Sequence, residues 1–432
     1  MLNREEPELL LLAPQLRTWS AQAEDLSNPV YCICDYLDIR GQVDPVLMSS
    51  AHDHVEREAE ALRLGIRNTE GEYRQFLRDE TAPLDFLDLS GESAPEAAAK
   101  SWMESDAHRP VDPLRLCTAA LIKVADDHFI LYRRVHHALV DGYSLALVFN
   151  RTAAVYTALA QGLPPGDGGF PPYARLLETD AEYRGTRSFA RDREHWLRKM
   201  AGHPEPVSLA GRKAGLAIGR RRTAELAPDA VARLERAAGG LGVTWSDLAV
   251  STMAAYVART TGAGELLLGL PTGGRLSPQT RNVPGMTMNI LPLRLTVDTT
   301  TSLDAFAGQV SREIREVLLH SRYPTAEISR ELAEQGGGSR LWGPMVNVMR
   351  FDYKLDFAGA HAAMRTASIP LTVDLTVYFF QTSADGTTEV ILDAHPELYS
   401  PEETDRHMDG LLSLLRSMES TEPHTVVGDI GS

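Results

Sequence analysis

The amino-acid sequence predicts an α/β protein of two lobes. Strand-like runs of β-branched, aromatic and aliphatic residues alternate with helix-like runs whose apolar residues recur every three or four positions. A chain of 432 residues exceeds the usual size of one core, and 43% hydrophobic residues suffices to bury two. The strongest break in composition, Pro164-Pro165-Gly166-Asp167-Gly168-Gly169, precedes Pro171-Pro172. We therefore expect a first lobe at residues 1–176 and a second at residues 177–432.

The first lobe is expected to alternate strands with helices. The strand-like runs are 30–39, 114–124 and 129–135, and the helix-like runs are 46–64 and 144–161. In the last helix, Leu145, Val148 and Phe149 begin one apolar face, and Ser144 is the expected N-cap. A strand therefore gives way to a helix between residues 135 and 144.

The second lobe is expected to carry more helix. The helix-like runs are 180–200, the residues after Pro228, a buried run 246–257, 303–319 and the residues after Pro401. Strands are expected at 266–270, 289–295 and 372–380, and Gly336-Gly337-Gly338 predicts an exposed loop. No sequence repeat relates the two halves.

Charge and cysteine usage exclude several classes of partner and compartment. A formal charge of -16 disfavours nucleic acid and anionic membranes as partners. The three cysteines, Cys32, Cys34 and Cys117, are an odd, low count that suits a reducing cytoplasm, and Cys32 and Cys34 are expected to pack in the core. No signal peptide and no run of membrane-spanning length is recognisable. We expect a cytoplasmic protein.

The strand-to-helix turn contains the run Arg134-Val135-His136-His137-Ala138-Leu139-Val140-Asp141-Gly142. In one interpretation both histidines are hydrogen-bonded at a strand end; in the other, one histidine is a base and Asp141 fixes the turn. Gly142 is expected to supply a backbone conformation closed to other residues. A metal site on His137 and Asp141 would need a third protein ligand, and no nearby His, Cys or Glu is spaced to supply it. No metal site is predicted.

This run resembles the HHxxxDG signature of condensation domains in nonribosomal peptide synthetases, which belong to the chloramphenicol-acetyltransferase-like superfamily. Other stretches are similar to the family's motifs and follow in its order: 12–19, 60–63, 268–275, 284–294, 343–348 and 396–399. Residues 64–66 depart from the pattern, since Leu-Gly-Ile replaces a second arginine and an aromatic. Residues 322–327 and 343–353 look most similar to domains of the enterobactin synthetase type.

The resemblance implies a fold and a set of site residues. The fold would be a two-lobed pseudo-dimer, each lobe a mixed sheet flanked by helices, with the active site in a tunnel between lobes, a bridging loop near 271–289 and a crossover segment near 345–380. His137 would act on the amine, with His136 supporting the turn. Asp141 would form a structural ion pair with Arg275, and Gly142 would offer an N–H to an oxyanion. The expected tunnel residues are Arg63, Asn289 and Asn347. For Arg63 a helix-end role stays equally open, as does a strand-end hydrogen bond for Asn347.

The resemblance also implies an activity and partners. The domain would transfer an acyl, aryl or peptidyl group from an upstream carrier-protein thioester to the amine of a downstream carrier-bound aminoacyl group, forming an amide. No cofactor would bind directly; the phosphopantetheine arms of the two carriers would enter the tunnel. Residues 426–430 are similar to the start of a linker to an adenylation domain, so we expect that the domain is excised from a larger synthetase. A monomer is expected. The alternatives are a freestanding acyltransferase and a catalytically silent recruitment domain. An epimerisation domain is disfavoured, because a glutamate-rich motif is missing at 284–294.

Overall fold

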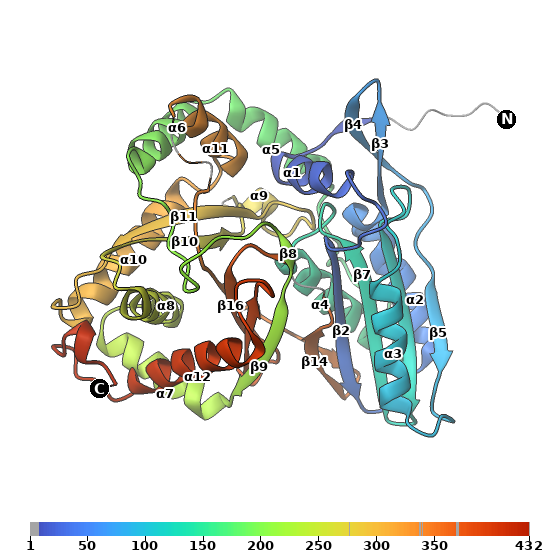
Figure 1. Ribbon diagram of the computed structural model, residues 1–432. Helices are drawn as coiled ribbons and strands as arrows, with labels where there is room; N and C mark the ends of the chain where they lie inside the picture. Colours follow the sequence, from blue (N-terminus) through green and yellow to red (C-terminus); the bar gives the residue numbers. More distant parts are fainter. Residues whose placement is uncertain (1–7, 276, 337, 339, 369–370, 432) are drawn as a thin grey trace.

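The computed structural model describes residues 8–275, 277–336, 338, 340–368 and 371–431, which form two lobes side by side (Figure 1). Gly336 and Gly338 of the predicted loop are exposed, whereas Gly337 lies outside the described residues. Each lobe is built around one six-stranded sheet. Among the described residues no helix combines the length and the apolar character needed to cross a membrane.

The N-terminal lobe contains a mixed sheet in the order β13-β14-β2-β7-β6-β5. Its strands are β2 (Cys32–Arg40), β5 (Leu84–Asp88), β6 (Cys117–Ala125), β7 (His128–His136), β13 (Asp356–Phe357) and β14 (Ala360–Thr366). Only β5 and β6 pair in parallel. All nine residues of β7 are buried, as its apolar sequence predicts for a central strand.

Helices cover both faces of this sheet. They are α2 (Pro45–Glu58), α3 (Pro95–Ala107) and α4 (Gly142–Ala160). Successive residues of a strand point to opposite faces: Tyr132 of β7 donates to Asp106 of α3, while Arg133 pairs with Glu56 of α2. Helix α4 packs beside α2, so the strand-to-helix turn after β7 returns the chain to that face.

The expected helix over residues 46–64 is shorter than predicted. It ends at Glu58 and is followed by a 3₁₀ turn, η1 (Glu60–Arg63), and by β3 (Leu64–Thr69). With β1 (Leu9–Leu10) and β4 (Glu72–Leu77), β3 forms a small antiparallel sheet. The run Leu64-Gly65-Ile66 is buried in this strand.

The C-terminal lobe contains the second sheet, in the order β11-β10-β12-β16-β17-β9. Its strands are β9 (Arg220–Leu226), β10 (Glu265–Thr272), β11 (Asn289–Thr296), β12 (Met345–Met349), β16 (Leu375–Gln381) and β17 (Thr388–Ala394). A two-stranded ribbon, β8 (Ala217–Ile218) with β15 (Leu371–Thr372), lies outside it. Because β12 pairs in parallel with both β10 and β16, this sheet is also mixed.

Most helices of this lobe agree with the sequence pattern. They are α5 (Ala174–Arg184), α6 (Arg187–Met200), α7 (Pro228–Gly240), α8 (Trp245–Thr261), α9 (Pro278–Arg281), α10 (Leu303–Leu319), α11 (Thr325–Glu334) and α12 (Pro401–Ser417). The range predicted for α10 is confirmed at both ends. The single helix predicted over 180–200 is wrong: the chain breaks after Arg184, and Thr186 caps a second helix by accepting from the Phe189 N–H at 3.2 Å.

One segment belongs to both sheets. The chain leaves the second sheet after β12, forms β13 and β14 in the first, and returns as β16. Strand β14 pairs with the edge of β2, for example Met364 opposite Leu37. The first hydrophobic cluster therefore combines Tyr173 and Leu176 with Phe357 and Met364. The lobe boundary near residue 176 stays a prediction.

Candidate active site

The histidine motif lies where β7 ends and α4 begins. His136 is the last residue of β7, and the His137 N–H donates to the Tyr31 carbonyl at 2.7 Å. Asp141, not Ser144, is the N-cap of α4, because its Oδ1 accepts from the Ser144 N–H at 3.0 Å. The prediction of Ser144 as the cap is therefore wrong by three residues, and the motif carboxylate itself begins the helix.

His136 is enclosed in the N-terminal lobe. Its Nδ1 accepts from the Ala138 N–H at 3.1 Å, and its Nε2 lies 3.3 Å from Oε1 of Gln22. Both contacts fit one neutral tautomer, with the proton on Nε2. The ring packs edge-on against Trp19, and burial lowers the pKa of His136 to about 3. His136 is thus a neutral, hydrogen-bonded part of the turn.

His137 has a different environment. Its side chain is partly exposed, and its Nδ1 has no hydrogen-bond partner among the residues that the structure describes. Burial lowers the pKa of His137, while the backbone carbonyls of His137 and Val140 and the charge of Asp141 partly offset this effect. His137 is therefore neutral near pH 7, and one of its ring nitrogens keeps a lone pair.

Asp141 and Arg275 form an ion pair. Arg275 Nη1 lies 2.7 Å from Asp141 Oδ2, and both side chains are almost fully buried. The Thr287 N–H and hydroxyl also donate to Oδ2, at 3.2 and 3.3 Å. Although burial would raise the pKa of Asp141, the charge and hydrogen bonds of Arg275 hold it below its usual value. The carboxylate therefore links the start of α4 to Arg275 and Thr287. Because its oxygen atoms accept hydrogen bonds from these donors and from Ser144, they are not free to bind a metal.

Ser144 completes this contact. Its hydroxyl lies 2.9 Å from Asp141 Oδ1 and 2.8 Å from the Gly285 carbonyl, and it accepts from Arg275 Nη2 and the Gly285 N–H. A hydroxyl with four partners is a structural group and not a nucleophile. Sequence reasoning gave no role to Gly285 and Thr287, although the run 284–294 is similar to a family motif.

Gly142 does not use the conformational freedom expected of it. It is absent from the residues with positive φ and adopts an ordinary helical start. The absence of a side chain at Gly142 leaves space, because an added Cβ would lie 3.6 Å from the Phe351 ring and 3.9 Å from Met349 Sδ. The prediction of a special backbone conformation is therefore wrong, and the missing side chain leaves room beside the crossover segment.

Arg63 does not line the pocket described below. Its Nε and Nη2 donate to the carbonyls of Glu56 and Arg57 in the last turn of α2, and Nη1 donates to the Arg78 carbonyl. This guanidinium is held at the C-terminal end of a helix, where unpaired carbonyls favour a cation, which favours the helix-end role; the tunnel role stays a prediction.

The two asparagines occupy different positions. Asn289, at the start of β11, donates to the carbonyls of Ser321 and Tyr323 and accepts from the Thr325 hydroxyl, and it lines the pocket. Asn347 alternates on β12 with Val346 and Val348, which pack in the second hydrophobic cluster. It therefore faces the side on which Met349 packs against the N-terminal lobe. No hydrogen bond from its side chain is present among the described residues.

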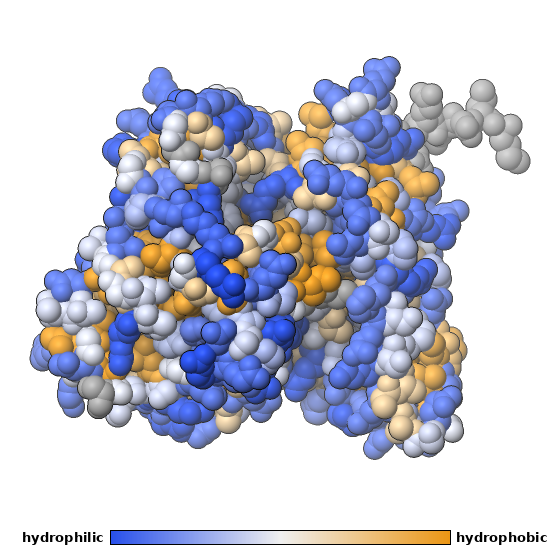
Figure 2. Space-filling model, viewed as in Figure 1, coloured by the Kyte–Doolittle hydropathy of each residue, from blue (hydrophilic) through white to orange (hydrophobic). Residues whose placement is uncertain are grey.

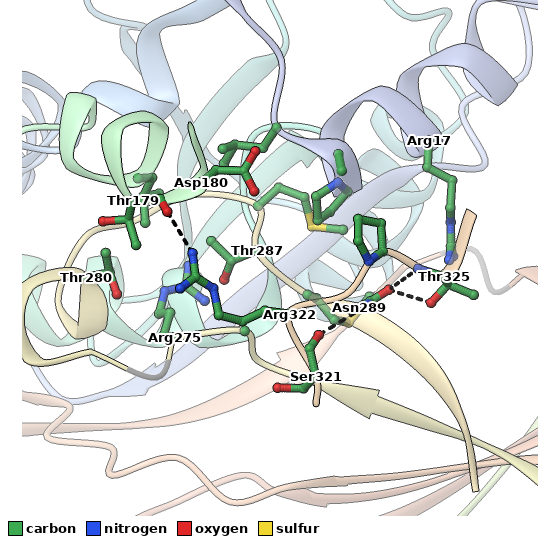
Figure 3. Close-up of a pocket in the computed structure, with 18 of the residues that line it drawn as sticks. Arg17, Thr179, Asp180, Arg275, Thr280, Thr287, Asn289, Ser321, Arg322 and Thr325 are labelled. Carbon is green, nitrogen blue, oxygen red and sulfur yellow. Dashed lines mark hydrogen bonds between the residues drawn. The ribbon is translucent and has the colours of Figure 1, made fainter. Parts of the chain in front are cut away.

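A pocket with an empty volume of about 810 Å³, its open mouth included, lies beside the Asp141–Arg275 contact. Figure 2 shows hydrophobic residues gathered along the hollow between the lobes, and Figure 3 shows the polar side chains around the pocket. Residues of α1 (Ala13–Gln22), α5, α9, α11 and the 273–289 segment line it, among them Arg17, Asp180, Arg275, Thr287 and Asn289. Arg275 both lines the pocket and binds Asp141, which places the pocket beside the motif.

The chain is similar to known proteins over almost its whole length. The condensation domain family matches residues 5–430. The first condensation domain of the calcium-dependent antibiotic synthetase, solved with a substrate analogue, superposes with a TM-score of 0.89 at 29% identity over 98% of both chains. The starter condensation domain of rhizomide synthetase, solved with C8-CoA, gives 0.90 at 32% identity over 98% of this chain and 97% of that one.

The relatives known by sequence are much longer proteins. A dimodular nonribosomal peptide synthase of Bacillus subtilis is 35% identical over 98% of this chain and 18% of its own length. An isonitrile lipopeptide synthase of Streptomyces coeruleorubidus is 38% identical over 94% of this chain and 28% of its own length. Enterobactin synthase component F of Escherichia coli O157:H7 is 27% identical over 98% of this chain and 33% of its own length. The predicted similarity to the enterobactin type is confirmed, at a lower identity than the other two. With its two-lobed mixed α/β fold and family-wide match, the chain belongs to the condensation domains of nonribosomal peptide synthetases, which are amide-forming acyltransferases.

Proposed function

We propose that this domain transfers an acyl, aryl or peptidyl group from the thioester of an upstream carrier protein to the amine of a downstream carrier-bound aminoacyl group. The observation that carries the proposal is the unequal pair of histidines. His136 is fully engaged in the turn, whereas His137 is neutral, partly exposed and held beside an inter-lobe contact.

The chemistry needs an uncharged amine close to the thioester. A free α-amine has a pKa of about 8, so most of it is protonated at neutral pH. We assign His137 as the group that accepts the amine proton or holds the amine in line during attack on the thioester carbonyl. The C–N bond then forms, the C–S bond breaks, and the proton passes to the departing thiolate.

The remaining groups position this step. The Gly142 N–H lies at the N-terminus of α4, where helix N–H groups lack partners within the helix and favour a developing oxyanion. Asp141 and Arg275 hold that helix end against the opposite lobe. Asn347 is proposed to face the reacting groups from β12. Because a thioester is already activated, positioning two tethered substrates supplies much of the rate.

We propose that the pocket receives one pantetheine arm. Its lining combines apolar groups, such as Leu12, Leu176 and Met286, with hydroxyl and guanidinium groups, which suits a chain of methylenes and amides. The rhizomide domain bound to C8-CoA supports an arm of this kind. Since the chain spans 18–33% of the three relatives named above, carrier proteins and an adenylation domain in the same cytoplasmic synthetase are the proposed partners. The domain itself is proposed to be monomeric.

The test supplies two loaded carrier proteins and measures the amide product by mass spectrometry. His137→Ala should lose product formation while circular dichroism shows a folded protein. His361→Ala is the control, because this histidine is 84% exposed at its side chain and its nearest charged partner is Asp356 of the adjacent strand. Undiminished condensation by folded His137→Ala would refute the assignment.

The same assay separates the alternatives. A freestanding acyltransferase would acylate a soluble amine as fast as the carrier-bound one, and a silent recruitment domain would form no product with any donor. A donor panel of octanoyl, aryl and aminoacyl thioesters would identify the acyl class.

A further inference from the structure

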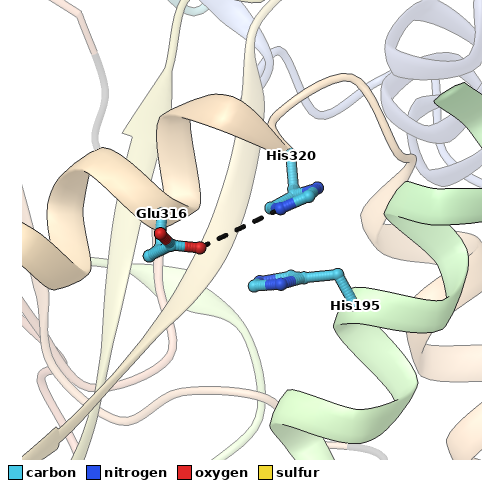
Figure 4. Close-up of side chains that lie close together, drawn as sticks. All are labelled: His195, Glu316 and His320. Atoms are coloured by element: carbon cyan, nitrogen blue, oxygen red, sulfur yellow. Dashed lines mark ion pairs between the residues drawn. The ribbon is translucent and has the colours of Figure 1, made fainter.

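Helices α6 and α10 bring two histidines and a glutamate together outside the proposed active site. His195 lies on α6, Glu316 is on α10, and His320 follows the end of α10 (Figure 4). One ligand atom from each of the three lies within 4.8 Å of the others. From these donors we propose a binding site for a divalent transition metal such as Zn²⁺, independent of the condensation chemistry.

A buried carboxylate orients one of the imidazoles. Nδ1 of His320 lies 2.8 Å from Oδ1 of Asp192, whose side chain is 3% exposed and whose Oδ2 accepts from the Tyr183 hydroxyl at 2.8 Å. A proton on Nδ1 leaves the Nε2 lone pair directed to the side of Glu316, 4.0 Å away. Metal-binding histidines commonly donate their second nitrogen to a carboxylate in this way.

His195 is available as the second ligand. Its ring stacks on His320 with centroids 3.7 Å apart and planes 15° from parallel, and neither of its nitrogens has a hydrogen-bond partner among the described residues. Partial burial and the neighbouring His320 lower the pKa of His195 to about 4, so it is neutral and able to bind a metal at pH 7.

The geometry needs only side-chain movement. Tetrahedral zinc with Zn–N bonds of about 2.0–2.1 Å holds its ligand nitrogens roughly 3.3 Å apart. Rotation of His195 about χ2 would tilt its ring so that its lone pair converges on that of His320, which keeps its bond to Asp192, and Glu316 is 53% exposed and free to approach. Two imidazoles and a carboxylate fill three positions, and water would take the fourth.

Nearby cations do not prevent binding. Arg198 and Lys199 follow His195 on α6, but Arg198 lies 3.5 Å from Glu194 and Lys199 pairs with Glu313 of α10. Arg191 likewise pairs with Asp192, at 3.1 Å from its Oδ1, and the carboxylates of Asp192 and Glu316 both face His320. A bound metal would link α6 to α10, which already meet through the bond from Trp196 Nε1 to the His320 carbonyl at 2.9 Å.

The test titrates Zn²⁺ into chelator-treated protein and reads binding by calorimetry and the melting temperature by circular dichroism. The wild type should bind one ion at this site and melt at a higher temperature with zinc. His195→Gln and Glu316→Gln should each weaken this binding at least tenfold and remove the zinc-dependent shift. Asp192→Asn, which replaces the orienting carboxylate that also contacts Tyr183 and Arg191, should weaken it by about 10–100-fold.

His54→Gln is the matched control. His54 and Glu58 form another histidine–glutamate pair four residues apart on a helix, with Nε2 2.9 Å from Oε1. This variant should bind zinc as the wild type does. Zinc affinity unchanged in both His195→Gln and Glu316→Gln, or lost equally in His54→Gln or His137→Ala, would overturn the proposal.

Discussion

Replacing Asp141 tests whether the carboxylate of the motif has a structural role, as the ion-pair partner of Arg275. Asp141→Ala leaves the buried guanidinium of Arg275 without its carboxylate and removes the N-cap of α4. Removing one partner of a buried ion pair costs about 3–5 kcal/mol, and losing a cap costs about 1 kcal/mol. Arg275 keeps its bonds to Ser144 and Gly285, so the loss should lie near 3–5 kcal/mol in total.

The assay is thermal and urea unfolding at pH 7, read by circular dichroism. Because the folded pKa of Asp141 is lowered, its stabilisation is present above its unfolded pKa of about 3.9 and is lost as the pH falls through the folded value. The full effect is therefore measured at neutral pH. At about 2–4 °C per kcal/mol for a unit of lobe size, the melting temperature should fall by about 10 °C.

A double-mutant cycle separates the pair from its surroundings. Asp141→Asn keeps the shape of the side chain but not its charge, and Arg275→Met removes the guanidinium. Each should destabilise the protein alone, while the double variant should recover part of the loss, since neither charge is then left unpaired. If Asp141→Ala melts at the same temperature as the wild type yet forms no amide, Asp141 acts in the chemistry, and a purely structural role of the ion pair is refuted.

Two further predictions concern the same turn. The pKa of His136 is about 3 in the folded protein and about 6.5 in the unfolded one, so the free energy of unfolding should fall as the pH drops below 6.5, by about 2 kcal/mol between pH 6.5 and 5. In urea unfolding, His136→Gln should lack this part of the pH dependence. An equal dependence on pH in the wild type and the variant would contradict the prediction. At Gly142 an added Cβ makes ordinary contacts with Phe351, so Gly142→Ala should keep the melting temperature and most of the condensation rate of the wild type. Gly142→Leu should lower the rate at least tenfold. An equal loss of rate in Gly142→Ala would instead indicate a requirement for the glycine backbone.

Much of the fold follows from local patterns. The apolar period of three to four residues located α10 to the residue, and the aromatic, aliphatic and β-branched residues of β7 located a central strand. The predicted helix boundaries are wrong where a single capping residue decides where a helix begins. Thr186 caps a new helix inside a continuous charged run, and Asp141 caps α4 ahead of Ser144, because a cap depends on backbone geometry that periodicity does not encode.

The site was less predictable because its contacts are long-range. The pair of Asp141 and Arg275 joins residues 134 positions apart and was expected only through family resemblance. For Arg63 the sequence left a helix-end role and a tunnel role equally open, since its partners are backbone carbonyls that every residue has. His195 and His320 are likewise distant in sequence, and only the packing of α6 against α10 brings their rings together.

The two adjacent histidines have unequal environments because the strand ends between them. His136 still belongs to β7, so its side chain takes the face shared with Tyr132 and Arg134, where Trp19 and Gln22 enclose it. His137 has left the strand, and its direction is set by the turn. To replace its neighbour, His136 would have to break its bonds to Ala138 and Gln22 and leave a buried site. If His137 is the base that we propose, a protein lacking its side chain therefore keeps an imidazole next to the gap and still has no base there.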